Sequence, residues 1–272
     1  MIYETISIQA EGSLEYARLH AYILDSAPSY QEGLVRPMIL LCPGGGYEHT
    51  SDREAEPVAM QLLAQGYHVG ILRYSVAPAR FPTALLELAQ AMKIVHEHAG
   101  EWHVNRKKIY VMGFSAGGHL AASLGAFWKQ EMVYAKTGVR AELLKPAGVI
   151  LCYPVITTEK KYIHEGSFKN LLGNASEELK KQLSIEKQVG TQFPPCFIWH
   201  TYTDKTVPVE NSLLLFLALR KAGINVEMHI YQEGEHGLSL GNASTSKKDG
   251  GQICRAVQSW IELLKVWMEN QV

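Results

Sequence analysis

The pentapeptide at residues 113–117, Gly-Phe-Ser-Ala-Gly, limits the fold of this chain more than any other stretch of its sequence. An apolar, strand-like run precedes it at 108–112, and a run of small residues typical of a helix follows at 118–124. The order of strand, G-x-S-x-G and helix indicates a turn so tight that it lifts the serine hydroxyl above a sheet. A side chain two residues to either side of the serine would collide with the backbone, whereas glycine has none. Ser115 is therefore a candidate nucleophile.

Apolar runs with strand character alternate with runs of helical spacing along the chain. The predicted strands are 2–8, 15–24, 37–42, 67–72, 108–112, 147–152, 195–200 and 224–231. The predicted helices are 53–65, 84–98, 118–128, 208–222 and 253–268. The first two strands alternate polar and apolar residues like an antiparallel pair, and the last alternates like an edge strand. The continuous apolar strands between them predict an α/β fold with a mostly parallel central sheet and helices on both faces.

Residues 155–192 interrupt this alternation. They are polar and charged, with a helical patch near Glu177–Leu183, and they lack the Gly/Ser composition of a flexible linker. We expect this excursion to form a cap or lid on the core. The 272 residues are thus predicted to form one α/β domain, 1–272, with 155–192 as an insertion.

Composition and charge exclude several classes of protein. The hydrophobic fraction of 47% and the charged fraction of 19% are those of a soluble globular protein. The 26 basic and 27 acidic residues nearly cancel, so neither a nucleic-acid groove nor an anionic membrane surface is expected as a partner. The first residues lack the pattern of a signal peptide, and no apolar run is long enough for a membrane span. We therefore expect a cytoplasmic protein.

The four cysteines, Cys42, Cys152, Cys196 and Cys254, have no C-x-x-C spacing. Three of them lie in or beside apolar strand-like runs, as small buried residues do. Free thiols in a reducing compartment fit this pattern better than a disulfide framework or a zinc site. Cys42 also adjoins a glycine-rich loop, but the interpretation as a core residue is favoured over a catalytic role.

A serine nucleophile needs a base and a group that orients the base. Behind a G-x-S-x-G turn these partners follow the serine in the order acid, then histidine. The chain has four aspartates, and only Asp204 lies between Ser115 and the C-terminal histidines. It directly follows the predicted strand 195–200, at the carboxyl edge of the sheet where ligands bind. Glu210 is an alternative acid, but it lies inside the following helix.

Eleven histidines compete for the role of base. His236 lies in a flexible loop after the last predicted strand, from which an imidazole can reach over the serine. His119, one turn after Ser115, is better explained as a packed helical residue. His96, His98 and His103 are too poorly spaced on a helix to hold a metal. No metal and no cofactor are expected.

Acyl transfer also needs hydrogen-bond donors for the oxyanion that forms on the substrate carbonyl. A run of three glycines, residues 44–46, follows the third predicted strand, and glycine lets backbone N–H groups approach a ligand closely. We expect the N–H groups of Gly45 and Gly46, together with that of Ala116, to supply these donors. The run has neither the Gly-Lys-Ser/Thr of a P-loop nor the G-x-G-x-x-G spacing of a dinucleotide site.

These motifs resemble the α/β-hydrolase superfamily of esterases and lipases over nearly the whole chain. The segments Pro43–Tyr47, Leu72–Ser75, Gly113–Ala121 and those around Asp204 and His236 are similar to a bacterial group of acetyl esterases, acetylxylan esterases and "sugar hydrolases". The resemblance implies that Ser115 is the nucleophile, His236 the base and Asp204 the acid. The chain departs from the His-Gly-Gly-Gly pattern of hormone-sensitive lipases by carrying Pro43 at the first position.

The resemblance also implies a substrate: a small-molecule ester, with a short acyl group such as acetyl on a sugar or oligosaccharide. Tyr47, Tyr74 and Tyr153 lie near predicted strand ends and are candidates for stacking on a sugar ring. The alternatives are a small peptidase of the prolyl-oligopeptidase type and an inactive hydrolase fold that serves as a binding module. Lactonase or thioesterase activity and the formation of a homo-oligomer are left open.

Overall fold

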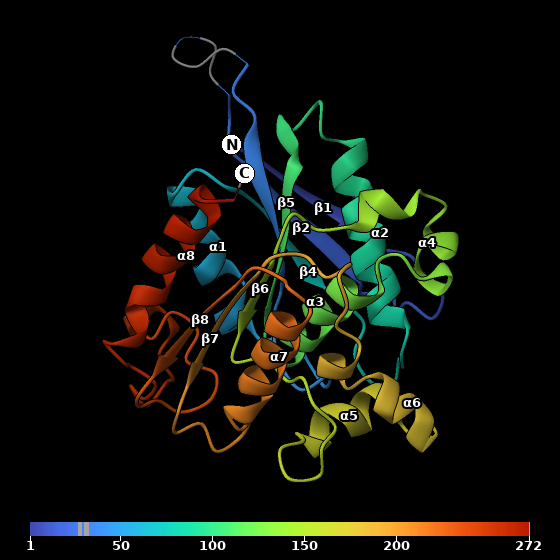
Figure 1. Cartoon of the computed structure of the whole chain (residues 1–272). Coiled ribbons are helices and arrows are strands. Elements are labelled where there is room, and N and C mark those ends of the chain that lie inside the picture. The colour runs from blue at the N-terminus through green and yellow to red at the C-terminus, as the bar shows by residue number, and fades with distance from the viewer. Residues whose placement is uncertain (27–28, 30–32, 272) are drawn as a thin grey trace.

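The computed structural model describes residues 1–26, 29 and 33–271 of the chain. Within this part, one sheet has the strand order β1-β2-β4-β3-β5-β6-β7-β8 (Figure 1). The strands are β1 (Ile2–Ser7), β2 (Arg18–Ile23), β3 (Arg36–Cys42), β4 (His68–Arg73), β5 (Val104–Phe114), β6 (Val149–Cys152), β7 (Cys196–Thr201) and β8 (Val226–Tyr231). β2 pairs antiparallel with both β1 and β4, and the other neighbouring strands run parallel.

The α-helices cover both faces of this sheet. They are α1 (Glu56–Ala64), α2 (Thr83–Glu97), α3 (Ser115–Phe127), α4 (Glu131–Thr137), α5 (Glu165–Leu172), α6 (Glu177–Gln182), α7 (Glu210–Lys221) and α8 (Trp260–Glu269). Buried residues of α2, α3 and α7 share one hydrophobic cluster, and those of α1 and α8 share another. The fold predicted from the sequence, a mostly parallel sheet between two helical layers, is confirmed.

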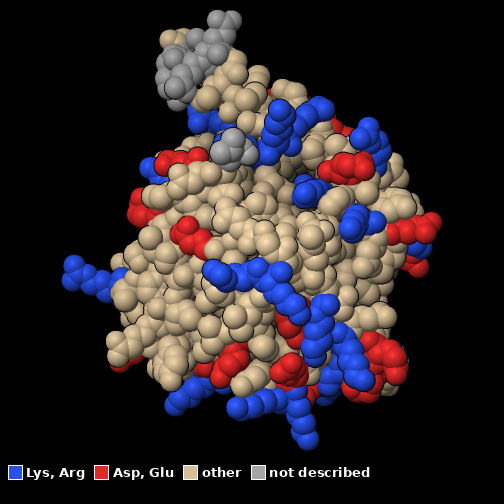
Figure 2. All heavy atoms as spheres, in the orientation of Figure 1, with Lys and Arg blue, Asp and Glu red and all other residues tan. Residues whose placement is uncertain are grey.

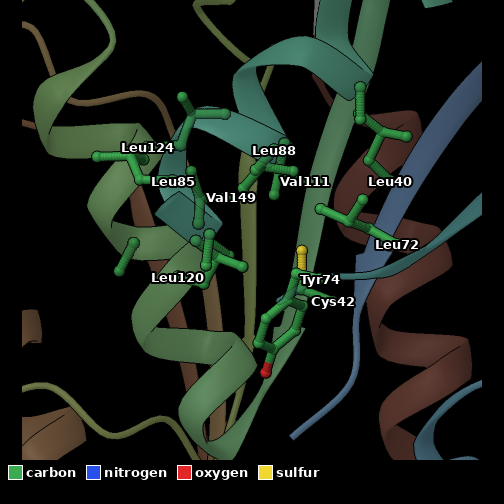
Figure 3. Close-up of a cluster of buried hydrophobic side chains, with 14 of the residues drawn as sticks. Leu40, Cys42, Leu72, Tyr74, Leu85, Leu88, Val111, Leu120, Leu124 and Val149 are labelled. Carbon is green, nitrogen blue, oxygen red and sulfur yellow. The ribbon is translucent and has the colours of Figure 1, made fainter. Parts of the chain in front are cut away.

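The alternation of side chains along β3 explains why the strand is apolar throughout. Met38, Leu40 and Cys42 belong to the cluster beneath α2 and α3, whereas Ile39 and Leu41 belong to the cluster beneath α1 and α8. Successive side chains of a strand point to opposite faces, so a strand with helices on both sides buries every residue. Figure 3 shows the first cluster, with labelled side chains of β3, β4, β5 and β6 against Leu85 and Leu88 of α2 and Leu120 and Leu124 of α3.

The structure corrects several predicted boundaries. Helix α3 begins at Ser115 itself, three residues earlier than predicted. The closing helix α8 spans only Trp260–Glu269, because residues 253–256 lie outside any helix. Helices α4 and α5 were not predicted; they have only 7 and 8 residues, too few for a hydrophobic period to repeat clearly.

The segment between β6 and β7 carries α5 and α6, which lie together beyond one end of the sheet, below α3 and α7 in Figure 1. It leaves the sheet beside the turn at Ser115, since the Val155 N–H donates to the Ser115 carbonyl (3.0 Å). Asn211 of α7 holds it further along, because its Oδ1 accepts from the N–H groups of Ile156 and Thr157 and its Nδ2 donates to the Tyr162 carbonyl. These contacts fix the path of the excursion.

Basic and acidic side chains are interspersed over the face of the molecule shown in Figure 2. Among the described residues, no helix is both long enough and apolar enough to span a membrane.

The packing of α3 on β3 depends on a glycine. A Cβ at Gly117 would lie 2.1 Å from the Cys42 carbonyl oxygen and 2.4 Å from that of Pro43, both backbone atoms. We expect Gly117→Ala to lower the free energy of unfolding by about 3 kcal/mol, the upper end of the usual cost of overpacking, because α3 must move off the strand. Urea unfolding followed by circular dichroism measures this change.

Gly100→Ala is the matched control, since a Cβ there meets no atom within 4 Å. Its free energy of unfolding should stay within about 0.5 kcal/mol of the wild type. Equal stability of the two variants would contradict the close contact between α3 and β3.

Candidate active site

Ser115 stands at the junction of β5 and α3 in a strained conformation. Its φ of 51° lies in the left-handed region, which is unfavourable for a residue with a side chain. The turn closes so tightly that a Cβ at Gly113 would lie 2.0 Å from the Gly117 carbonyl oxygen. The glycines of the G-x-S-x-G motif are therefore sterically required. Ser115 is 6% exposed, so its hydroxyl lies in a sheltered position.

The structure brings Ser115, His236 and Asp204 together. The Ser115 Oγ lies 2.7 Å from the Nε2 of His236, and the His236 Nδ1 lies 2.6 Å from the Oδ2 of Asp204. The carboxylate can only accept when ionised, so the His236 Nδ1 carries the proton and its Nε2 accepts from the serine hydroxyl. Asp204 follows β7 and His236 follows β8, and the parallel pairing of these strands places both loops at the same edge. This arrangement matches the geometry by which a histidine activates a serine.

The Asp204 carboxylate is buried but has four hydrogen-bond donors. Its Oδ1 accepts from the N–H groups of Thr206 and Val207, both at 2.9 Å, and its Oδ2 lies 3.3 Å from the Nε2 of His200 in addition to His236. Burial by itself raises the pKa of Asp204, but the hydrogen bonds from His200 and His236 outweigh it and hold the pKa well below its usual range. The carboxyl group is therefore ionised at neutral pH.

His200 is a partner of this carboxylate that sequence reasoning missed. Its Nε2 faces both Asp204 and the Val207 carbonyl (3.0 Å), so this nitrogen carries the proton, and its Nδ1 accepts from the Ser212 hydroxyl (2.7 Å). The side chain is fully buried. Its place at the end of a strand, four residues before Asp204, was the available signal, but spacing alone does not show that the loop between them folds back.

The glycine loop, residues 43–46, lies directly against Ser115. A Cβ at Gly44 would lie 2.9 Å from the Cβ of Ser115. Each carbonyl oxygen of residues 43–46 has a donor: the Tyr74 hydroxyl for Pro43, the Ser51 N–H for Gly44, the Glu48 and His49 N–H groups for Gly45 and the Asn170 Nδ2 for Gly46. The conformation of the loop is therefore held from several sides.

The N–H groups of Gly45 and Gly46 point away from these donors. In a trans peptide the N–H of one residue is directed opposite to the carbonyl of the residue before it. The carbonyls of Gly44 and Gly45 are turned back into the loop, and within the described residues no group of the protein accepts from either glycine N–H. The φ angles of 124° at Gly45 and 65° at Gly46 are ones that glycine adopts readily. Ala116 lies in the first turn of α3, where an N–H has no partner within the helix.

Glu54 holds the glycine loop and, through Tyr153, the loop that carries His236. Its Oε2 accepts from the Gly44 N–H (2.8 Å) and its Oε1 from the Tyr153 hydroxyl (2.6 Å), which in turn accepts from the Ser239 N–H (2.9 Å). The Tyr153 ring meets the His236 ring edge to face at 5.1 Å. Nothing in the sequence around Glu54 indicates this role, because its partners Gly44 and Tyr153 lie in other segments, 10 and 99 positions away.

The prediction that Tyr47, Tyr74 and Tyr153 contact substrate is wrong for this structure. Their exposed fractions are 3%, 0% and 1%, so their rings cannot stack on a ligand. The hydroxyl of Tyr74 donates to the Pro43 carbonyl (2.7 Å), and that of Tyr47 lies 3.0 Å from the Nδ1 of His119. These tyrosines follow strands at the correct edge of the sheet, but they point into the protein and support the loops.

His119 connects the glycine loop to the excursion. Its Nε2 donates to the Leu183 carbonyl (2.9 Å), so its Nδ1 is unprotonated and accepts from the Tyr47 hydroxyl. Burial lowers the pKa of His119 to about 4, and the ring is neutral at physiological pH. The expectation of a packed helical histidine is confirmed by its 1% exposure.

The cysteines are free, and Cys42, Cys152 and Cys196 are buried. Burial raises the pKa of all three thiols, which makes them poor nucleophiles.

Among the residues that the structure describes, no three His, Cys, Asp or Glu side chains gather as a metal ion would require.

Comparison with known proteins places the chain in a family. Residues 26–219 match the family described as BD-FAE. The chain belongs to the BD-FAE family. It is 34% identical over 243 residues to endo-1,4-beta-xylanase B of Butyrivibrio fibrisolvens, a match that covers 87% of this chain and 38% of the relative. An acetylxylan esterase of Xylanibacter ruminicola is 28% identical over 236 residues, 85% of this chain and 46% of the relative.

The fold of this BD-FAE protein is that of the α/β-hydrolases. A similar solved structure is the acetyl ester-xyloside bifunctional hydrolase from Caldicellulosiruptor lactoaceticus. The two share 38% sequence identity with a TM-score of 0.79, over 93% of this chain and 87% of the other. The chain spans less than half the length of the two curated relatives above, but most of the length of this solved structure. The resemblance to esterase-like α/β-hydrolases seen in the sequence is thereby confirmed.

The neutral state of His119 predicts a pH dependence of stability. Above pH 6.5 its ring is neutral in the folded and the unfolded chain; between pH 6.5 and 4 only the unfolded chain binds the proton, so stability falls as the pH falls. From pH 7.5 to 5.0 this amounts to about 2 kcal/mol.

We expect His119→Phe to reduce the loss of unfolding free energy between these two pH values by that amount, because phenylalanine does not titrate. Urea unfolding at both pH values measures the difference. His68, whose pKa burial also lowers to about 4, remains in both proteins and cancels in the comparison. An unchanged pH dependence would show that His119 is not kept neutral by the fold.

Proposed function

We propose that this protein is a serine carboxylic-ester hydrolase that works through an acyl-enzyme and removes short acyl groups, acetyl above all, from sugars or oligosaccharides. The observation that carries the proposal is the continuous line of hydrogen bonds from Ser115 through His236 to Asp204, at 2.7 and 2.6 Å, beside a glycine loop with unpaired N–H groups. A nucleophile, its base, an orienting acid and oxyanion donors are the parts that acyl transfer needs.

In the proposed first step, the Ser115 oxygen attacks the ester carbonyl carbon while its proton moves to the Nε2 of His236. In this proposal the negative charge that develops on the carbonyl oxygen is stabilised by the N–H groups of Gly45, Gly46 and Ala116, for which no protein acceptor is found among the described residues. Asp204 holds the imidazole in the correct tautomer and stabilises its positive charge. His236 then protonates the departing alcohol, and the acyl group remains on Ser115.

In the second step, water attacks the acyl-enzyme while His236 accepts a proton from it. The Ser115 oxygen then leaves, takes this proton back, and the carboxylic acid is released. Deacylation uses the same N–H groups and the same base. The buried carboxylate and its four donors need no rearrangement between the two steps.

The names of similar proteins support acylated sugars as the proposed substrates. One relative is named as a xylanase, another as an acetylxylan esterase, and the similar solved structure as a hydrolase of acetyl esters and xylosides.

We further propose that residues 155–192 act as a cap of a single α/β-hydrolase domain. The excursion packs against the nucleophile turn through Val155 and against the glycine loop through Asn170, which supports this role.

Replacement of the serine tests the function. We expect Ser115→Ala to lower the hydrolysis of 4-nitrophenyl acetate by roughly 10³-fold or more, since no other hydroxyl lies within reach of His236 in the described structure. Labelling with a fluorophosphonate probe should be lost in parallel, and release of 4-nitrophenol gives the rate.

Ser123→Ala is the matched control. This serine also lies in α3, but its hydroxyl donates only to the His119 carbonyl within the helix. The control should keep both its rate and its labelling. Equal labelling of Ser115→Ala and the wild type would place the nucleophile elsewhere and sink the proposal.

A further inference from the structure

Helix α5 of the excursion directs a polar stripe at the glycine loop. The stripe consists of His164, which caps the helix, Ser167 and Asn170. Ser167 and Asn170 are three residues apart in the helix and so lie on the same face. His164 precedes the helix and extends this row through the contact of its Nδ1 with the Ser167 Oγ (2.8 Å). The Asn170 Nδ2 donates to the Gly46 carbonyl at 2.9 Å, and the Ser167 Oγ lies 3.9 Å from where a Cβ of Gly46 would stand. The row therefore borders the same loop that adjoins Ser115.

The helix is fixed in this position by contacts with the core. The Phe168 ring meets the His119 ring edge to face at 5.2 Å, and Phe168 itself is buried. The Phe81 N–H donates to the Leu171 carbonyl (2.9 Å), and the Arg80 guanidinium donates to the Asn170 carbonyl. These contacts hold α5 in a fixed position beside the glycine loop, so its polar row keeps a defined orientation.

The Nε2–H of His164 is a hydrogen-bond donor that is not used by the described part of the protein. Its Nδ1 accepts from the Ser167 backbone N–H (3.3 Å) and lies 2.8 Å from the Ser167 Oγ. A backbone N–H only donates, so the Nδ1 is unprotonated and the proton of the neutral ring lies on Nε2. Within the described residues no protein group accepts from this Nε2–H.

Burial and nearby charges affect the pKa of His164. Burial lowers the pKa of His164, and the charge of His236 lowers it further, whereas the charge of Asp204 raises it. His164 is therefore neutral at pH 7 and keeps its Nε2–H.

We propose that His164 is a specificity-determining residue whose Nε2–H donates to an oxygen of the alcohol part of the ester. This inference rests on the proposed function. The carbonyl oxygen of the substrate is taken up by the glycine loop, and an acetyl group has no other polar atom. The remaining acceptors belong to the alcohol, so the donor favours alcohols with a hydroxyl or ring oxygen near the ester, as in acylated sugars and other polyols.

The test compares two esters of the same length, 2-hydroxyethyl acetate and propyl acetate; the first carries a hydroxyl group where the second carries a methyl group. The kcat/KM of each is measured by titration of the acetic acid released and divided by its rate of alkaline hydrolysis, which corrects for intrinsic reactivity. We expect the wild type to prefer the hydroxylated ester by about fivefold, the range of one neutral hydrogen bond.

In His164→Asn this preference should disappear. Asparagine is a good N-cap and preserves the start of α5, but it lacks the reach of the imidazole Nε2–H. A merely structural role would lower both rates together and leave their ratio unchanged. Ser176→Ala, which removes the N-cap of α6, is the control and should keep the ratio of the wild type.

Three results would overturn the inference: no preference in the wild type, a preference that survives in His164→Asn, or a preference equally lost in Ser176→Ala. The first needs no variant, so the test holds even if His164→Asn does not fold. Failure of the wild type to hydrolyse either acetate would instead overturn the proposed function itself, and the inference with it.

Discussion

The buried negative charge of Asp204 is the constraint on which the rest of the active site depends. A carboxylate out of contact with water is stable only when donors surround it. Here two backbone N–H groups, His200 and His236 do so, which ties the loop after β7 to the loop after β8. The charge thereby orients the imidazole of His236, and through it the hydroxyl of Ser115.

A second constraint is the conformation of the glycine loop. Its carbonyls are bound by donors from several parts of the chain, including Tyr74 next to β4 and Asn170 in α5. Because the peptide is planar, holding the carbonyls also aims the N–H groups. In the proposed mechanism, donors that are held in place before the substrate binds need no reorganisation as charge develops on the carbonyl oxygen, and this lowers the barrier. Through Asn170, the excursion also takes part in holding the glycine loop.

The sequence predicted the elements that depend on a local pattern of residues. Continuous apolar strands such as β3 and β6 gave the parallel sheet, and the G-x-S-x-G turn gave the place of Ser115. Asp204 followed from the order of the motif and the scarcity of aspartates. The tyrosine prediction was wrong because Tyr47, Tyr74 and Tyr153 stand at strand ends, where the sequence does not show whether a ring points outward or inward. His200 was missed because its partnership depends on the path of a loop.

What the sequence alone determined is the sheet, its two helical layers and the identity of the residues that meet at its carboxyl edge. These follow from local spacing, from sterics at glycine and from the rule that parallel strands end together. Only the tertiary structure decided which groups surround them: His200 on the carboxylate, Glu54 beneath the loops, and α5 with His164 beside the glycine loop. These contacts join residues that are between four positions apart, as His200 and Asp204 are, and 124 positions apart, as Gly46 and Asn170 are, and they form only when the loops and the core have packed.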